Sequence, residues 1–223
     1  MMNPDLSFNA DERAAVYRAI EARRDIRHFR GDPVPDHVLE RILQAAHHAP
    51  SVGFMQPWNF IVVRSIETRQ RVLASFEETN RAELARIADQ ERRALYRSLK
   101  LEGILECPLN LVVTCDRNRD LPFVLGRAPM EEMDLYSTCL AIENLWLAAR
   151  VEGVGVGWVS ILDPDKIAAL FAFPDGVRLV AYLCVGYPVE FRARPMLEEA
   201  GWKERLPLED LVFAERWGQR PGA

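Results

Sequence analysis

The segment Met133–Arg150 constrains the fold more than any other stretch of this sequence. Its leucines and Trp146 are spaced so that apolar side chains cover most of the circumference of the predicted helix. A helix of this kind lies at the centre of a fold or at a subunit interface. Glu143 interrupts it and it is too short to cross a bilayer, so we expect a core or interface helix.

The rest of the chain fits one globular domain around that helix. The 223 residues are 49% hydrophobic, which is enough for a sizeable core over residues 1–223. A net charge of −5 argues against nucleic acid or an anionic membrane as the main partner, because both favour a broad basic face. The N-terminus has no apolar leader and the four cysteines form no C-x-x-C pair, so we expect buried, reduced thiols in a cytoplasmic protein.

Helix and strand patterns are mixed along the chain. Asn9 and Glu12 predict a capping box at the start of a first helix, and a second helix is predicted over 36–48. Strands are predicted over four apolar runs: 60–63, 109–115, 154–161 and 179–187. These strands are too few for a doubly wound sheet, so we expect an α+β fold with stacked layers.

Two segments stand apart from this plan. Residues 67–106 are charged and helical in character, which is typical of a solvated helix face and also compatible with a helical lid over a site. Residues 192–223 have the character of an irregular C-terminal extension. The glycines within 153–157 have the wrong spacing for a dinucleotide fingerprint, and the histidines lack a zinc-binding spacing. We therefore expect neither a Rossmann site nor a metal site.

The stretch RRDIR, residues 23–27, carries three arginines around one aspartate at a predicted helix end. Arginines at a helix end can simply bind free carbonyl groups. Alternatively, Arg23 and Arg27 share a helix face and bracket one phosphate, while Arg24 and Asp25 point elsewhere. The local pattern leaves both interpretations open.

Two further stretches hold polar groups on constrained backbone. APSVGFMQPWNF, residues 49–60, places Ser51 and Gln56 on a loop stiffened by two prolines. This loop suits in-plane hydrogen bonding to a flat heterocycle, or it only connects a helix to a strand. EGVGVGWVS, residues 152–160, ends on Ser160, and its alternating glycines admit a ligand close to the backbone or allow tight packing against the preceding helix.

Together these three stretches resemble the nitroreductase-like flavoproteins, from about Ala14 to Trp217. The resemblance implies a three-layer α+β fold with a central mixed, mostly antiparallel sheet, in an intertwined homodimer whose interface includes Met133–Arg150. It also implies an FMN site. The implied FMN-binding residues are Arg23, Arg24, Asp25, Ile26, Arg27, Ser51, Gln56, Pro57, Trp58, Lys100, Leu101, Gly157, Trp158, Val159, Ser160 and Arg205.

Two departures from the common family pattern narrow the resemblance. Phe54 stands at the usual Asn of the loop P-S-x-x-N-x-Q-P-W, and Asp25 stands where Ser or Thr is frequent. With YRSLKLEGI, residues 96–104, these departures resemble the 5,6-dimethylbenzimidazole synthase branch. That branch is implied to split reduced FMN with oxygen into 5,6-dimethylbenzimidazole, for the lower ligand of cobalamin, and erythrose 4-phosphate. A separate flavin reductase is then an expected supplier of the reduced FMN.

Such chemistry requires a fixed phosphate, an apolar oxygen pocket and a proton acceptor near the first ribityl carbon. We expect Asp25 to be the acid/base group and Ser160 to orient the flavin or an oxygen-derived intermediate. Phe54, Met55 and Trp58 are the expected walls of the oxygen pocket. The alternatives are an NAD(P)H-dependent FMN nitroreductase or flavin reductase, and a flavin-binding protein without turnover.

Overall fold

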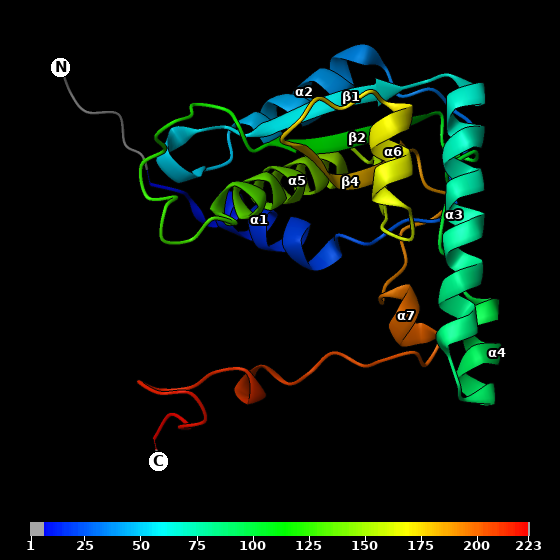
Figure 1. The fold of residues 1–223 in the computed structure, drawn as a ribbon. Coiled ribbons are helices and arrows are strands. Elements are labelled where there is room, and N and C mark those ends of the chain that lie inside the picture. The colour runs from blue at the N-terminus through cyan, green and yellow to red at the C-terminus, as the bar shows by residue number, and fades with distance from the viewer. Residues whose placement is uncertain (1–6, 223) are drawn as a thin grey trace.

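A four-stranded antiparallel sheet forms the centre of the domain in the computed structural model, which describes residues 7–222 (Figure 1). The strands, in their order across the sheet, are β1 (Trp58–Val63), β2 (Leu109–Asp116), β4 (Val177–Gly186) and β3 (Gly155–Val159). All four predicted strands are confirmed, with shifts of a few residues at their ends. A single parallel bridge, from Asp25 to Val156, extends the sheet beyond β3, so the sheet is mixed only at that edge.

Helices cover both faces of this sheet. In chain order they are α1 (Ala10–Ala22), α2 (Asp36–His47), α3 (Ile66–Arg86), α4 (Gln90–Ser98), α5 (Met133–Val151), α6 (Pro164–Leu170) and α7 (Met196–Glu199), with short 3-10 turns at η1 (Val52–Phe54) and η2 (Leu208–Asp210). The helices α2 and α5 pack on one face, and α3 and α6 pack on the other. The three-layer α+β fold is therefore confirmed.

Alternation along the strands produces one hydrophobic core on each face. In β2, Leu111 and Val113 point into the core shared with α2 and α5, while Val112 points into the core shared with α3 and α6. In β4, Leu183 and Tyr182 divide in the same way. Because neighbouring side chains of a strand point to opposite faces, near-continuous apolar runs are what a sheet covered on both faces requires.

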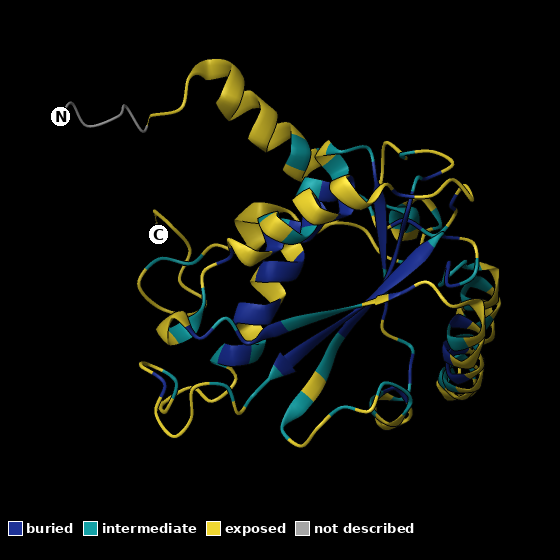
Figure 2. Cartoon of the chain, turned by 90° about the horizontal axis from the view of Figure 1, so that it is seen from above, coloured by how far each residue is buried: buried dark blue, intermediate teal, exposed yellow. Residues whose placement is uncertain are grey.

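The helix α5 is confirmed as a core helix, and its place at a subunit interface stays a prediction. Ile142 and Leu145 are fully buried against the sheet, as Figure 2 shows in dark blue for its inner face. On the opposite side Tyr136 and Leu140 remain 51% and 48% exposed. One side of α5 therefore fills the core, and the other side presents large apolar side chains on the surface of a single chain.

The first helix, α1, begins with the predicted capping box. The Asn9 side chain accepts a hydrogen bond from the Glu12 backbone at 3.0 Å, and the Glu12 carboxylate accepts one from the Asn9 backbone at 2.8 Å. No residue of α1 is buried, and the helix beside the N-terminus is yellow, for exposed, over most of its length in Figure 2. The exposed apolar residues of α1 include Val16, Tyr17 and Ile20.

The segment predicted as helical over 67–106 is divided. It contains α3, a break, α4 and an irregular stretch over 99–106. The helix α3 packs into the core through Val72 and Phe76, which are 0% and 6% exposed. It is therefore part of the fixed domain, and only α4 with the following stretch keeps the features expected of a lid.

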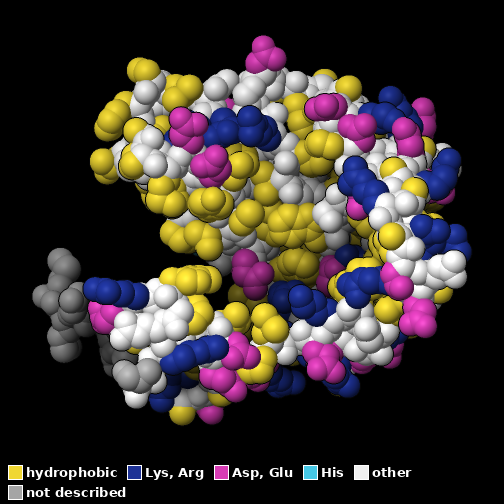
Figure 3. Space-filling view, turned by 60° about the horizontal axis from the view of Figure 1, so that its bottom comes forward, with side chains coloured by type: hydrophobic (Ala, Val, Ile, Leu, Met, Phe, Trp, Pro, Cys, Tyr) yellow, Lys and Arg dark blue, Asp and Glu magenta, His cyan; other side chains and the backbone are white. Residues whose placement is uncertain are grey.

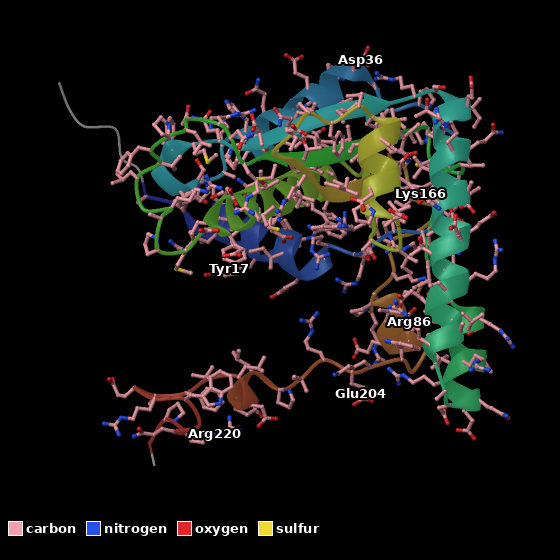
Figure 4. The ribbon with its side chains drawn as sticks, viewed as in Figure 1. Tyr17, Asp36, Arg86, Lys166, Glu204 and Arg220 are labelled. Carbon is pink, nitrogen blue, oxygen red and sulfur yellow. The ribbon has the colours of Figure 1, made fainter. Side chains whose placement is uncertain are left out.

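The C-terminal segment 192–222 leaves the domain as an extended arm (Figure 1). Near its start, Trp202 packs under the Arg92 guanidinium of α4, 3.9 Å from the ring centroid. Further along, Leu208 and Trp217 are 71% and 92% exposed. A wide hollow opens between arm and domain in Figure 3, and Figure 4 shows Tyr17 on the domain side of this gap, with Glu204 on the arm.

Two remaining predictions concern thiols and membranes. Cys107, Cys115 and Cys184 are buried as expected, but Cys139 is exposed, because it lies on the outer side of α5. No helix within residues 7–222 is long and apolar enough to cross a membrane.

Candidate functional site

The RRDIR stretch is extended and lies along the edge of β3. Helix α1 ends at Ala22, and Arg23 already has extended backbone angles, φ −64° and ψ 133°. The Ile26 backbone donates a 3.0 Å hydrogen bond to the carbonyl of Val156. The prediction that Arg23 and Arg27 share a helix face is therefore wrong. In extended backbone alternate residues share a side, so Asp25 lies on the same side as both arginines.

Two glycines of β3 make room for this stretch. A Cβ atom on Gly157 would lie 2.6 Å from Arg27 Nη1 and inside van der Waals contact of the Ile26 carbonyl. A Cβ atom on Gly155 would lie 2.9 Å from Ile26 Cγ1. The alternating glycines thus allow the RRDIR backbone to approach β3 closely. One interpretation of the sequence had expected close packing against the preceding helix instead.

Asp25 and Arg27 form a bidentate ion pair that is also bound to β3. Arg27 Nη1 donates to Asp25 Oδ1 at 2.8 Å, and Nη2 donates to Oδ2. The backbone of Trp158 contacts both partners, donating to Asp25 Oδ1 at 2.9 Å and accepting from Arg27 Nη2 at 2.8 Å. The prediction that Asp25 points away from the arginines is wrong, because the pair fixes its orientation toward them.

Burial and hydrogen bonding act on the pKa of the Asp25 carboxyl group in opposite directions. Burial of the carboxyl group among the surrounding elements raises its pKa above the ordinary value, although Arg27 and the Trp158 N–H lower it. The side chain is still 42% exposed, and Asp25 lines the small cavity described next. A carboxylate with a raised pKa and an open face is suited to accept a proton from a bound molecule.

Two arginines here keep polar atoms that no protein group satisfies. Among the described residues, Arg24 Nε and Arg27 Nε are buried without a hydrogen-bond partner. Both residues line a cavity of about 100 Å³, together with Arg192 and Arg194 and the acidic Asp25 and Glu190. Four guanidinium groups against two carboxyl groups around a small cavity fit an anion such as a phosphate. The residues present therefore fit the phosphate group of FMN.

Arg192 and Arg194 had no signal in the sequence beyond their charge. Each already contacts a carboxylate of the same segment: Arg192 pairs with Glu199 at 2.7 Å and Arg194 with Glu198 at 3.0 Å. Only the return of the chain after β4, where Val189 bonds to the carbonyl of His28, brings them beside the RRDIR stretch.

Lys100, Leu101 and Ser160 complete this edge of the sheet. A Cβ atom on Gly103 would lie 2.6 Å from Phe29, so the stretch after α4 packs directly on the RRDIR segment. Lys100 forms ion pairs with Glu102 at 3.0 Å and Glu106 at 2.7 Å. Ser160 is exposed at the end of β3.

The remaining predicted residues lie at the opposite edge of the sheet. Ser51, Gln56, Pro57 and Trp58 precede or begin β1, which is separated from the RRDIR stretch by β2, β4 and β3. At about 4.8 Å between neighbouring strands, that separation is about 19 Å across the sheet. One chain therefore does not bring its two groups of predicted flavin contacts together.

The loop at the β1 edge is held by contacts that the sequence did not reveal. Arg119 donates to the carbonyls of Gln56 and Trp58. The Ser51 hydroxyl accepts from the Gln56 backbone at 3.0 Å, and Gln56 has a positive φ of 48°. Gln56 and Trp58 line an open groove of about 660 Å³ between α2 and β1, and this groove lies far from Asp25.

The predicted oxygen pocket does not form at this edge within one chain. Met55 and Trp58 are 2% and 4% exposed, and Trp58 belongs to the core between α2 and the sheet. Phe54, in contrast, is 78% exposed. Arg205 is exposed on the C-terminal arm, away from both edges. Within residues 7–222 no group of three or more acidic, Cys or His side chains could hold a metal ion.

This fold, with an extended arginine-rich segment on β3 and a polar loop before β1, matches one established family. The nitroreductase family model matches residues 20–187. The chain therefore belongs to the nitroreductase family.

Within that family the chain is similar to a 5,6-dimethylbenzimidazole synthase of Rhodospirillum rubrum. The two are 44% identical over 200 residues, which cover 90% of this chain and 94% of the relative. This similarity confirms the branch predicted from the sequence.

Solved structures share the fold at lower identity. A BluB-like flavoprotein from Clostridium difficile 630 aligns with a TM-score of 0.68 and 19% identity, covering 90% of this chain and 99% of that chain. An iodotyrosine deiodinase bound to FMN and 3-iodo-L-tyrosine aligns with a TM-score of 0.67 and 23% identity, covering 79% and 91%.

Proposed function

We propose that this chain is a 5,6-dimethylbenzimidazole synthase that uses reduced FMN and oxygen as substrates. The observation that carries the proposal is the 44% identity to a relative of that name over 94% of its length. The Asp25–Arg27 pair supports it, because it places an oriented carboxylate beside a cluster of arginines. When bound, reduced FMN supplies the electrons for oxygen and the ring and ribityl carbons of the product.

The arginines of the RRDIR stretch are proposed to have different roles. Arg23 and Arg24 are the proposed phosphate ligands, as the family resemblance implies. Both Nη atoms of Arg24 donate to backbone carbonyls of Glu21, Arg23 and Ala193, and Arg23 Nε lies 3.6 Å from the Glu143 carboxylate, so each side chain exchanges such a contact for the phosphate. Arg27 positions Asp25 and contributes its free Nε. A fixed phosphate holds the ribityl chain in one place while its bonds are broken.

Asp25 is the proposed proton acceptor for the first ribityl carbon. Its raised pKa lies closer to neutral pH than the pKa of an ordinary carboxyl group, so the carboxylate is a stronger base. Ser160 follows Val159 at the end of the same strand and offers a hydroxyl to orient the flavin. Replacing Ser160 with Gly should lower product formation while flavin binding persists; undiminished product would exclude the role of Ser160.

The active assembly is proposed to be a homodimer. The apolar outer sides of α1 and α5 and the apolar arm are exposed in one chain, which is typical of surfaces that a second subunit covers. In such a dimer, Gln56 of the partner subunit faces the flavin held at the β3 edge, and Arg205 reaches the phosphate from the arm. The helix α4 with residues 99–102 then closes the site and keeps bulk water out.

Two expectations from the sequence enter the proposal unchanged. The chain acts in the cytoplasm, and a separate flavin reductase supplies the reduced FMN.

One experiment separates the proposed function from its alternatives. Purified protein is mixed anaerobically with chemically reduced FMN, air is admitted, and products are separated by chromatography. We expect 5,6-dimethylbenzimidazole and a tetrose phosphate in equal amounts. Intact FMN with peroxide would contradict the proposal, and would indicate a flavin reductase if NADH is consumed or a binding protein if it is not.

A further inference from the structure

Arg119 lies in the turn that follows β2 and reaches back to the loop before β1. Its Nη1 donates to the carbonyl of Gln56 and, at 3.3 Å, to the carbonyl of Trp58. Its Nη2 donates to Asn59 Oδ1 at 2.6 Å. One guanidinium group therefore binds acceptors of three residues at the β1 edge, and the proposed function gives this side chain no role.

The turn that carries Arg119 is anchored to the sheet. The Asp116 backbone donates to the Pro57 carbonyl at 2.8 Å, and the Asp116 carboxylate accepts from the Asn118 backbone at 3.0 Å. The same carboxylate lies 3.7 Å from Arg119 Nε. Every nitrogen of the guanidinium group thus faces a hydrogen-bond acceptor or an opposite charge, so the group is held in one orientation.

The neighbouring Arg117 attaches the same turn to helix α5. Its Nε donates to Asp134 Oδ2 at 3.0 Å, and Arg127 pairs with that oxygen at 2.7 Å. Asp134 is fully buried, and loss of either partner of a buried charge is costly. The turn is therefore fixed on both sides of Arg119.

The backbone of Gln56 needs such support. Its φ of 48° lies in the left-handed region, which a residue other than glycine occupies only where its surroundings hold it there. The Ser51 hydroxyl accepts from the Gln56 N–H at 3.0 Å, and Arg119 binds the Gln56 carbonyl. Arg119 is thus one of two side chains that hold this peptide in place.

The side chain of Gln56 is oriented as a result. Its Nε2 donates to the Phe54 carbonyl at 3.2 Å. Its amide oxygen has no hydrogen-bond partner among residues 7–222, and Gln56 is half-buried beside the open groove. An amide oxygen in this position can accept a hydrogen bond from an N–H group of a bound ring.

We propose that Arg119 is a positioning residue for flavin recognition, because it holds the Gln56 backbone so that the Gln56 amide faces the bound ring. The inference rests on the proposed function, which gives Gln56 its contact with the flavin. Arginine suits this task, because its planar group binds several acceptors in fixed directions, whereas the lysine ammonium is a point charge.

The affinity of the full-length protein for FMN, measured by flavin fluorescence, tests this role. Arg119→Met should weaken binding about 3–10-fold, as much as Gln56→Ala, because both changes remove the same contact. The visible absorption spectrum of bound FMN should shift in the same way in both variants. Arg64→Met is the matched control, because Arg64 lines the same groove but donates to Asp36 of α2 at 2.6 Å, and it should leave the affinity unchanged.

A double-mutant cycle separates positioning from a general structural role. In the Gln56→Ala background, Arg119→Met should cause no further loss of FMN affinity, because Arg119 acts through Gln56. A direct contact of Arg119 with the flavin, or a general loosening of the fold, would lower the affinity further in that background and would overturn the proposal. Wild-type affinity in Arg119→Met, while Gln56→Ala binds weakly, would also overturn it.

Arg119→Lys keeps the charge and tests the geometry of the hydrogen bonds, and it decides the question even if Arg119→Met does not fold. We expect it to bind FMN as weakly as Gln56→Ala. Wild-type affinity in Arg119→Lys would show that charge alone suffices, against the proposal.

If neither the Arg119 variants nor Gln56→Ala change the affinity, the ring-facing role of Gln56 and the positioning role of Arg119 are both wrong. The proposed reaction is judged separately, by the products that the wild-type protein forms from reduced FMN and air.

Discussion

The two edges of the sheet differ in how they present polar groups. At the β3 edge, Asp25 and Arg27 are charged, bound to each other and bound to the backbone of Trp158. At the β1 edge, Ser51 and Gln56 are neutral and are held through backbone contacts. The first arrangement suits phosphate binding and proton transfer, and the second suits in-plane recognition of a flat ring. The difference teaches that each edge carries only one of the two kinds of contact that the proposed flavin site requires.

The largest predicted effect is the loss of activity when Asp25 is replaced, compared with the smaller loss of flavin affinity when Gln56 is replaced. Asp25→Asn should lower the rate of dimethylbenzimidazole formation about 10²–10⁴-fold, because it removes the proton acceptor. Gln56→Ala should weaken flavin affinity only about 3–10-fold, as expected for one neutral hydrogen bond. Product is measured by chromatography and binding by flavin fluorescence. An Asp25→Asn variant with the normal product rate would remove Asp25 from the mechanism.

Mixed dimers test whether the two edges belong to one site across two chains. Asp25→Asn should be inactive alone, and Gln56→Arg, which blocks the ring-facing edge, should be inactive alone. Refolded together, half of the dimers carry one intact site, so activity should return to about a quarter of wild type. Mixtures that stay inactive, while wild type treated in the same way recovers, would show that each site belongs to one chain.

Adding one methyl group at Gly157 tests the close packing of the RRDIR stretch on β3. Gly157→Ala should destabilise the protein by about 1–3 kcal/mol, since its Cβ would overlap the Ile26 carbonyl and approach Arg27. Gly31→Ala is the control, because nothing lies within 4 Å of its added Cβ. Urea unfolding of both variants measures the difference. Equal stability would contradict the close approach at Gly157.

The smallest effect concerns the charge around Asp25. Arg27→Gln should raise the pKa of Asp25 further, and Arg23→Gln should raise it less, because Arg27 is the stronger of the two influences that lower it. The carboxyl ¹³C shift of Asp25 during a pH titration measures both. An equal response to the two substitutions would contradict the ion pair seen here.

The raised pKa of Asp25 also makes the stability of the protein depend on pH. A carboxyl group with a raised folded pKa contributes stability that is full below the ordinary pKa of 3.8 and is lost as pH rises through the folded value. Arg27→Gln should therefore move this loss to higher pH.

Local patterns predicted the elements better than their long-range contacts. The apolar positions of α5, the four strands and the capping box of α1 are set by neighbours in the sequence, and all are confirmed. The RRDIR stretch was predicted on a helix because nothing nearby in the sequence ends α1 at Ala22. What ends it is the pairing of Ile26 with Val156, which is far away along the chain.

The burial of single side chains escaped prediction for the same reason. Phe54, Met55 and Trp58 lie within five residues of sequence and are apolar, but tertiary packing buries Met55 and Trp58 and exposes Phe54. The contacts of Arg119 with the Gln56 loop span about 60 residues of sequence and leave no local pattern.

In the proposed homodimer, the arm from 192 to 222 makes protein concentration a variable of stability. Leu208, Leu211 and Trp217 are exposed on one chain, so their burial requires contact with a second molecule. For such a dimer stability follows mass action: dilution lowers the melting temperature, and a preparation too dilute to dimerise loses the contribution of the arm.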